Sequence, residues 1–265
     1  MITPILMLGA GRMGGAMIEG WLASGAFAAA DLIIRDPHPG AAAEAAVRAG
    51  ATLNPPDAEL ARAQTVVLAV KPQTWRDAAA EIGPWLASGA VIVSVAAGVR
   101  AGDISRAFGD RPTARVMPTT AAAIGQGTAS LYADDPAALS RAHALFEPLG
   151  TVVDLTDETL MHAATGVSGS APAYLYAFIE ALEAAGAAAG LAPADAQRLA
   201  RSTITGAASL LARSGEEPSE LRRQVTSPGG TTQAALDVLL AGGGLPDLIR
   251  EAVAAAVRRS KELGT

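Results

Sequence analysis

The sequence predicts an α/β first half, residues 1–156, followed by an all-helical second half, residues 157–265. In the first half, short apolar and β-branched runs alternate with helical segments, which is the pattern of a parallel sheet covered on both faces. After residue 157 there is no further strand-like run, and long stretches rich in Ala and Leu keep helical spacing. Because 265 residues suffice for two ordinary domains, we expect one domain in each half.

The apolar runs and the helical periods between them define the expected elements. Seven strands are expected, at Pro4–Leu8, Leu32–Arg35, Thr65–Val70, Ala90–Ala96, Thr113–Met117, Gly127–Ala133 and Gly150–Leu155. Between them, helices are expected at Arg12–Ser24, Ala41–Ala49, Trp75–Leu86, Ala101–Phe108 and Ala137–Pro148. The second half is expected to be helical near 157–189, 193–213, 217–225, 231–241 and 245–262. Ala and Gly on their faces allow close approach, as in a bundle or across a subunit interface.

The composition narrows the possible partners and locations. A net charge of −6 argues against nucleic acid, whose phosphates attract basic surfaces. No apolar run reaches the roughly 18–20 residues of a bilayer-spanning helix, so no membrane partner is expected. Residues 1–10 lack a preceding basic segment and are expected to form a strand, not a signal peptide. The absence of cysteine fits a cytoplasmic protein, and three histidines without ligand spacing predict no metal site.

A glycine-rich loop follows the first expected strand. Its sequence, Gly9-Ala10-Gly11-Arg12-Met13-Gly14, has the G-x-G-x-x-G spacing and opens the first helix of a β-α-β unit. In this context Gly9 makes the tight turn, Gly11 lets the backbone approach a pyrophosphate, and Gly14 lets the helix pack on the sheet. The loop therefore predicts a Rossmann dinucleotide-binding domain, with Gly9, Ala10, Gly11, Arg12 and Met13 at the cofactor.

Two adjacent residues at the end of the second strand point to opposite cofactors. Asp36 occupies the place where an acidic side chain bonds the ribose 2′-hydroxyl of NAD. Arg35 precedes it and has the charge to grip the 2′-phosphate of NADP. Asp36 is also a good turn residue before Pro37. The sequence leaves the choice open, and both residues are candidate cofactor ligands.

Two further segments end neighbouring strands, at the sheet edge where open α/β folds bind ligands. Ala69-Val70-Lys71-Pro72 follows one strand, and Val95-Ala96-Ala97 follows the next. We expect both segments at the cofactor. Lys71 is equally consistent with a solvated lysine at a strand end.

A second helix start with anion-binding character lies at Val225–Thr232, Val-Thr-Ser-Pro-Gly-Gly-Thr-Thr. Gly229 and Gly230 let the backbone approach a ligand, and the following helix offers free N–H groups and the positive end of its dipole. A small carboxylate fits such a socket. Thr231 and Thr232 are also consistent with helix capping. Two distant sockets predict a cofactor and a separate acidic substrate.

These motifs together resemble the pyrroline-5-carboxylate reductase family over the full length of the chain. The specific matches are Ala69–Pro72, Arg115–Pro118, Gly166–Tyr174 and Leu221–Thr232. The resemblance implies reduction of the carboxylated imine 1-pyrroline-5-carboxylate to L-proline with NADPH, NADH being possible. It also implies an all-α dimerisation domain after the Rossmann domain, in a homodimer or a larger ring of dimers.

The resemblance also assigns residues by matching position. Glu158 and Gln224 fall where family members contact ligands, and Thr231 and Thr232 fall where the substrate carboxylate is held. Since the substrate is already electrophilic when its nitrogen is protonated, positioning carries most of the rate. Thr232 is expected to orient the imine or relay a proton, because a hydroxyl is a poor acid. Ser170 is expected either to cap a helix or to line the substrate cleft.

The sequence departs from the family at several positions. Thr119 and Ala121 replace the usual Asn and Pro after Met117-Pro118, and Ala171 replaces a glycine. Asp36 stands where NADP-using members carry a small or neutral residue.

Two other functions are less consistent with the sequence. A β-hydroxyacid dehydrogenase would carry a catalytic lysine at Tyr174, whereas the only lysines are Lys71 and Lys261. A non-catalytic NAD(P)-binding regulator would not need the socket at Val225–Thr232.

Overall fold

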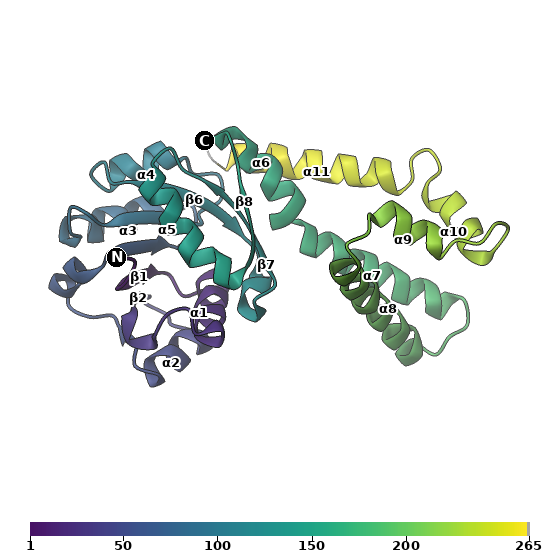
Figure 1. The fold of residues 1–265 in the computed structure, drawn as a ribbon, viewed down its shortest axis with the longest axis horizontal. Coiled ribbons are helices and arrows are strands. Elements are labelled where there is room, and N and C mark those ends of the chain that lie inside the picture. Colours follow the sequence, from purple (N-terminus) through teal and green to yellow (C-terminus); the bar gives the residue numbers. More distant parts are fainter. Residues whose placement is uncertain (264–265) are drawn as a thin grey trace. The chain divides into compact units, whose positions relative to one another are not determined.

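The computed structural model describes residues 1–263, which form two compact units (Figure 1). The first unit comprises Met1–Gly169 together with residues 256–263, and the second comprises Ser170–Ala255. The predicted domain boundary at residue 156 lies just after the last strand, β8, which ends at Asp154. The two compact units divide later, between Gly169 and Ser170. The last two residues of the range 157–265 lie outside the described residues.

The first unit is built on one eight-stranded sheet with the order β3-β2-β1-β4-β5-β6-β7-β8. All neighbouring strands are parallel except β6 and β7, which are antiparallel. The strands are β1 (Ile5–Leu8), β2 (Leu32–Arg35), β3 (Thr52–Leu53), β4 (Thr65–Leu68), β5 (Val91–Ser94), β6 (Thr113–Pro118), β7 (Gly127–Tyr132) and β8 (Gly150–Asp154).

The seven expected strands are present, and the sheet differs from the expectation in two ways. β3 was not predicted, because its two residues are too few to carry a periodic pattern. β7 runs antiparallel to β6, which corrects the expectation of a wholly parallel sheet. The connection between them holds only the short helical turn Thr120–Ile124, and a parallel return needs a longer crossover.

Helices cover both faces of the sheet and form two hydrophobic clusters. On one face, β1 directs Ile5 and Met7 toward side chains of α1 (Arg12–Ser24), α2 (Ala41–Arg48) and α5 (Pro136–Phe146). On the other face, Leu6 and Leu8 meet α3 (Trp75–Ile82) and α4 (Ala101–Ala107). Trp21 on α1 is fully buried, and its indole N–H donates to the Leu145 carbonyl oxygen at 2.7 Å. This two-faced core holds the carboxyl ends of the strands in place.

Short helical elements complete the first unit after β8. A turn at Glu158–Leu160 leads into α6 (Met161–Ala164), and a π-helical turn at Thr165–Gly169 follows. The expected single helix over 157–189 is therefore divided, and its longer part begins at α7.

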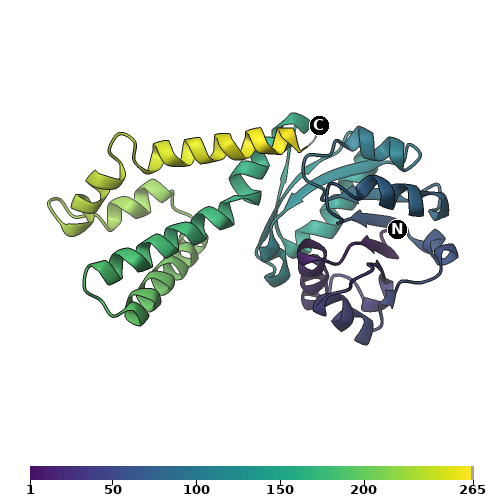
Figure 2. The ribbon, with the colours of Figure 1, turned by 180° about the vertical axis from the view of Figure 1, so that it is seen from behind.

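The second unit is entirely helical over its described residues. Its helices are α7 (Ala171–Ala188), α8 (Pro193–Ser214), α9 (Pro218–Gln224), α10 (Thr231–Leu239) and the first part of α11 (Leu245–Glu262). α7 and α8 pack side by side (Figure 2). Within residues 1–263, no helix is both long and apolar enough to cross a membrane.

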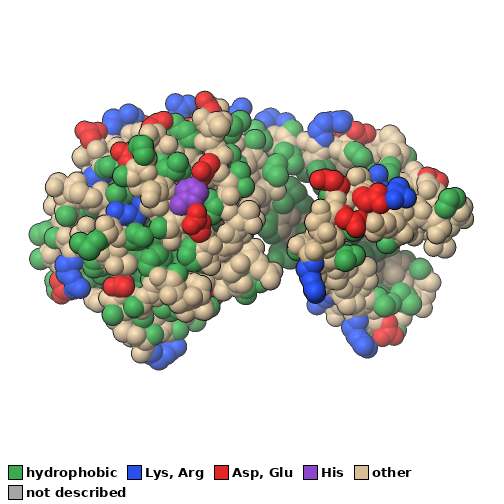
Figure 3. Space-filling model, viewed as in Figure 1, with side chains coloured by type: hydrophobic (Ala, Val, Ile, Leu, Met, Phe, Trp, Pro, Cys, Tyr) green, Lys and Arg blue, Asp and Glu red, His purple; other side chains and the backbone are tan. Residues whose placement is uncertain are grey.

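The second unit has little core of its own. Only Ala196 and Ala200 of α8 are buried among its hydrophobic residues. α7 has no buried residue, although most of its side chains are apolar. Large apolar side chains such as Phe178 and Leu182 remain exposed, and apolar groups lie at the surface of this unit in Figure 3. A surface of this kind is typical of a subunit interface.

Candidate active site

The glycine loop between β1 and α1 has the geometry of a pyrophosphate cradle. Gly9 has φ of +89°, and its N–H donates to the Arg35 carbonyl oxygen at 2.9 Å. A Cβ on Gly14 would lie 2.1 Å from the Gly9 carbonyl oxygen, so only glycine fits there. A Cβ on Gly11 would meet nothing within 4 Å, and no side chain caps α1. The open N-terminus of α1 therefore suits the pyrophosphate of a dinucleotide.

Two cavities adjoin this loop. One, of about 510 Å³, is lined by the loop and by the segment after β2, including Gly11, Arg12, His38, Gly40 and Thr120. The other, of about 370 Å³, is lined largely by apolar side chains, with Arg35, Asn54 and Glu81 among them. The cradle thus has cavities beside it in which the rest of a cofactor can lie.

Asp36 and Arg35 lie at the end of β2 in different environments. The Asp36 carboxylate accepts hydrogen bonds from the Ala10 N–H at 2.6 Å and from the His38 N–H at 2.7 Å. The Arg35 guanidinium donates to the Asp57 carboxylate at 2.8 Å, the Glu81 carboxylate at 3.1 Å and the Pro55 carbonyl oxygen at 2.9 Å. Asp36 therefore faces the glycine loop, whereas Arg35 is engaged by acidic partners.

Asn54 was not among the expected site residues. Its side chain accepts from the Asp36 N–H at 3.0 Å and donates to the Asp36 carbonyl oxygen at 2.8 Å. The pair of bonds fixes the backbone of Asp36. No local motif in the sequence connects these two residues, which are 18 positions apart.

The two expected strand-end segments lie at the same sheet edge as the glycine loop. Ala69 follows β4, and its N–H donates to the Leu8 carbonyl oxygen at 2.8 Å. Val95 follows β5, and its N–H donates to the Leu68 carbonyl oxygen at 3.0 Å. Lys71 is exposed. The structure brings the segments containing Ala69–Pro72 and Val95–Ala97 together, and their contact with a cofactor stays a prediction.

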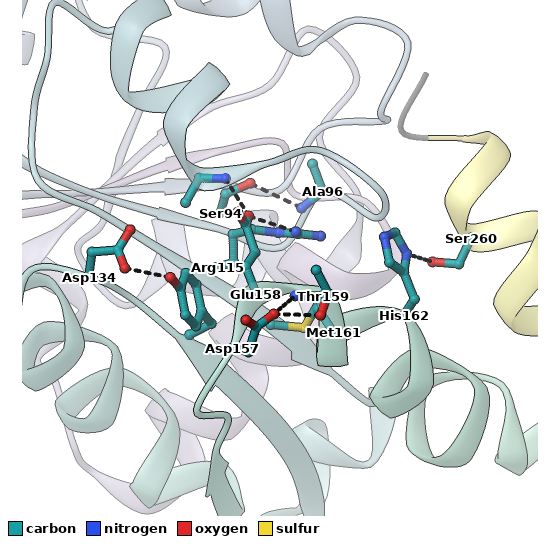
Figure 4. A network of polar contacts seen from close by, with 12 residues as sticks. Ser94, Ala96, Arg115, Asp134, Asp157, Glu158, Thr159, Met161, His162 and Ser260 are labelled. Carbon is teal, nitrogen blue, oxygen red and sulfur yellow. Dashed lines mark hydrogen bonds and ion pairs between the residues drawn. The ribbon is translucent and has the colours of Figure 1, made fainter.

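Glu158 joins three elements of the first unit (Figure 4). One of its carboxylate oxygens accepts from the Arg115 guanidinium at 2.8 Å and from the Ala101 N–H, at the start of α4, at 2.7 Å. The Arg115 side chain is only 4 % exposed, so its charge needs this partner. Glu158 therefore has a structural contact that the sequence did not reveal, and its expected contact with substrate stays a prediction. In the sequence, Arg115 belongs to the Arg115–Pro118 match, which does not indicate its partner.

His162 ties the C-terminal part of α11 to the first unit. A ring nitrogen of His162 lies 2.9 Å from the hydroxyl of Ser260, which is buried. Burial, with the charges of Arg115, Lys261 and Arg100, lowers the pKa of His162. The lowered pKa favours the neutral ring, and its hydrogen bond to Ser260 gives His162 a structural role. Among residues 1–263, no group of three or more His, Asp or Glu side chains is placed to hold a metal ion.

The second socket lies in the helical unit and has the expected local form. Gly229 has φ of +69°, and the Gly230 N–H donates to the Ser227 carbonyl oxygen at 3.0 Å. α10 begins at Thr231, with Gly230 as its N-cap and no capping side chain. The threonines are thus the first two residues of the helix and do not cap it. Their hydroxyls make no hydrogen bond within the described chain.

The remaining expected residues lie near this unit's helix ends. The Gln224 amide donates to the Glu216 carboxylate at 2.6 Å and to that of Glu220 at 3.3 Å. Ser170 occupies the N-cap position of α7, but its hydroxyl does not cap the helix. The Tyr174 hydroxyl oxygen is buried without a partner among the described residues. The ligand contacts expected for Gln224 and Ser170 stay predictions.

Comparison with known proteins gives family matches for both parts of the chain. Residues 158–263 match the family described as pyrroline-5-carboxylate reductase dimerisation. Residues 4–98 match the family described as NADP oxidoreductase, coenzyme F420-dependent. The chain is similar to the pyrroline-5-carboxylate reductase of Synechocystis, at 38% identity over 97% of each chain.

Solved structures are similar over the whole chain. A pyrroline-5-carboxylate reductase from Coxiella burnetii matches with a TM-score of 0.90 and 29% identity, covering 100% of both chains. The pyrroline carboxylate reductase of Plasmodium falciparum with NADP bound matches with a TM-score of 0.85 and 26% identity, covering 99% of this chain and 98% of the other. The matched dimerisation family accounts for the exposed apolar side chains of the second unit.

Proposed function

This chain belongs to the pyrroline-5-carboxylate reductase family, and we propose that it reduces 1-pyrroline-5-carboxylate to L-proline with NAD(P)H, the last step of proline biosynthesis. The observation that supports this most is the presence of two separate anion sockets, each at a helix start. One suits a dinucleotide pyrophosphate, and the other suits the carboxylate of a small substrate. A β-hydroxyacid dehydrogenase would need a lysine where this chain has Tyr174.

The first unit would hold the cofactor, NADPH or NADH. Backbone N–H groups of Gly11, Arg12 and Met13 bind the pyrophosphate at the start of α1. The segments Ala69–Pro72 and Val95–Ala97 lie beside the nicotinamide end. When bound, the cofactor supplies the hydride. The protein binds and orients both reactants and keeps water away from them.

The second unit would hold the substrate. N–H groups at Gly230, Thr231 and Thr232 bind the carboxylate, and the positive end of the α10 dipole favours its charge. The Thr232 hydroxyl, which has no protein partner in the described chain, orients the ring nitrogen or relays a proton to it. Glu158, Ser170 and Gln224 remain further candidates for ligand contacts.

We also propose a homodimer, or a ring of such dimers, formed through the second unit in the cytoplasm. The support is the matched dimerisation family and the apolar side chains of α7, none of which is buried.

Initial rates with 1-pyrroline-5-carboxylate and either NADPH or NADH test the proposed function. We expect substrate-dependent loss of nicotinamide absorbance and an equal amount of L-proline, measured by mass spectrometry. Cofactor oxidation without proline, or no turnover with either cofactor, would overturn the proposal. A β-hydroxyacid assayed with NADP⁺ in the same way serves as the substrate control.

A further inference from the structure

We infer that Asp36, and not Arg35, sets cofactor discrimination, so that the adenosine site accepts NADH at least as well as NADPH. This inference rests on the cofactor-binding part of the proposed function. Its test measures ligand binding without turnover, and the two proposals can therefore fail separately.

Arg35 is already paired with groups of the protein. Its guanidinium is already bonded to two carboxylates, those of Asp57 and Glu81, and to the Pro55 carbonyl oxygen. Arg35 therefore has two carboxylate partners, and Asp36, the next residue in the chain, adds a third carboxylate nearby. A cation neutralised in this way offers little attraction to an added phosphate.

Asp36 lies at the position that contacts the adenosine ribose in dinucleotide-binding folds. It directly follows β2, which ends at Arg35, and at this place an acidic side chain bonds the 2′-hydroxyl in dinucleotide-binding folds. The residue is 9 % exposed, and its carboxylate is positioned by the Ala10 and His38 N–H groups. Asn54 holds the backbone of the same residue from the other side. The carboxylate therefore cannot turn away without breaking its two hydrogen bonds, those from the Ala10 and His38 N–H groups.

The chemistry of the two possible ribose substituents differs. A carboxylate has about four acceptor sites, so Asp36 can accept a further bond from a 2′-hydroxyl. A 2′-phosphate is largely dianionic at neutral pH and meets Asp36 as a like charge. The site therefore favours the hydroxyl of NADH over the phosphate of NADPH.

Arg35 is expected to contact the adenine ring and not the ribose substituent. It lines the cavity of about 370 Å³ together with Leu8, Val70 and Ile82. Three hydrogen bonds fix the plane of its guanidinium, and arginine stacks well on flat rings. We expect this side chain to form one wall of the adenine site, and its loss weakens NADH and NADPH alike.

Calorimetric titration of the whole protein with 5′-ADP and with 2′,5′-ADP tests the inference. In the wild type, 5′-ADP is expected to bind at least as tightly as 2′,5′-ADP. In Asp36→Ser, the affinity ratio shifts toward 2′,5′-ADP by about tenfold, the effect of removing one like charge at a partly solvated site. Asp36→Asn keeps an acceptor for the Ala10 N–H and is expected to shift the ratio in the same direction. Thermal melting checks that each variant is folded.

Variants of the basic residues near the site test the alternative, that one of these side chains binds the 2′-phosphate. If Arg35→Gln, Arg12→Gln or His38→Gln selectively lost 2′,5′-ADP, that side chain would hold the phosphate and the inference would be wrong. A wild type that prefers 2′,5′-ADP, or an unchanged ratio in both Asp36 variants, would overturn it as well. Arg62→Gln is the matched control, because Arg62 is exposed and, among residues 1–263, its side chain pairs with Glu59 alone. It is expected to leave both affinities unchanged.

Discussion

The two anion sockets have the same local design but differ in what holds them in place. The glycine loop at α1 is fixed by distant parts of the chain, through the Gly9 bond to Arg35 and the Asp36 bond to Ala10. The socket at α10 is held by local bonds, such as that from Gly230 to Ser227. The first socket is therefore preorganised by its own domain core. The second lies on a unit with almost no buried core, so we expect its rigidity to depend on subunit association.

Gly14→Ala is the largest expected disruption of the first socket. The new Cβ would lie 2.1 Å from the Gly9 carbonyl oxygen and 3.1 Å from the Gly9 carbonyl carbon, so the backbone of the loop would have to shift. We expect a loss of more than ~4 kcal/mol of stability and no cofactor binding, measured by denaturant unfolding and calorimetry. Gly11→Ala is the matched control, because its Cβ meets nothing within 4 Å. It should fold normally and bind cofactor about tenfold more weakly. Equal behaviour of the two variants would contradict this account.

Phe178→Asp tests the dependence of the second unit on association. Phe178 lies on α7 and is 38 % exposed within one protomer. A charge buried in an apolar interface is costly, so we expect dissociation of the oligomer and a melting temperature that depends on protein concentration. Light scattering after size exclusion measures the mass. Val47→Asp is the control, since Val47 has a similar exposure of 37 % but lies on α2 of the first unit. A Phe178 variant that keeps its mass would show that α7 is not in the interface.

Thr232→Ala tests the chemical role of the second socket. Because neither threonine caps α10, the change should leave the helix and the melting temperature intact. We expect turnover to fall by roughly 10- to 100-fold through loss of imine orientation, with smaller changes in KM. Thr203→Ala, on the exposed surface of α8, is the matched control. Unchanged kinetics in the Thr232 variant would remove this hydroxyl from the active site.

The smallest expected effect concerns a pH-dependent contact in the first unit. His143 of α5 lies 2.9 Å from the Glu147 carboxylate and 2.8 Å from that of Asp154, at the end of β8. Burial opposes the charged ring, but the two carboxylates outweigh it and raise the pKa of His143. A raised pKa in the folded state gives stability that is present below the ordinary value of about 6.5 and is lost at higher pH.

Melting curves between about pH 6 and pH 8 test this contact. The wild type should lose about 2 °C or less relative to His143→Gln as the pH rises, because the pair is near the surface. Parallel curves for the two proteins would show that folding does not raise the pKa of His143.

The sequence predicted the features of the site that depend on neighbouring residues. The glycine spacing identified the cradle at α1, and Gly229-Gly230 before a helical run identified the second socket. It did not predict the features that depend on residues distant in the chain. Arg115 gave no indication of Glu158 as its partner, and Arg35 gave none of Asp57 and Glu81. Asp36 and Arg35 therefore remained equal candidates until their partners were known.

The direction of β7 illustrates the same limit. Its composition predicted a strand, but only the short turn Thr120–Ile124 before it determines that it runs antiparallel to β6. The two residues of β3 carry no periodic signal, and their pairing with β2 places them in the sheet.

The burial of Trp21 has a practical consequence for experiments on this protein. All three tryptophans, Trp21, Trp75 and Trp85, lie in the first unit, and Trp21 and Trp75 are buried. Tryptophan fluorescence, excited at a wavelength that tyrosine does not absorb, therefore reports on the sheet unit alone. Far-ultraviolet circular dichroism is sensitive to the all-helical unit as well. Recorded on the same sample, the two signals separate the unfolding of one unit from that of the other without any attached label.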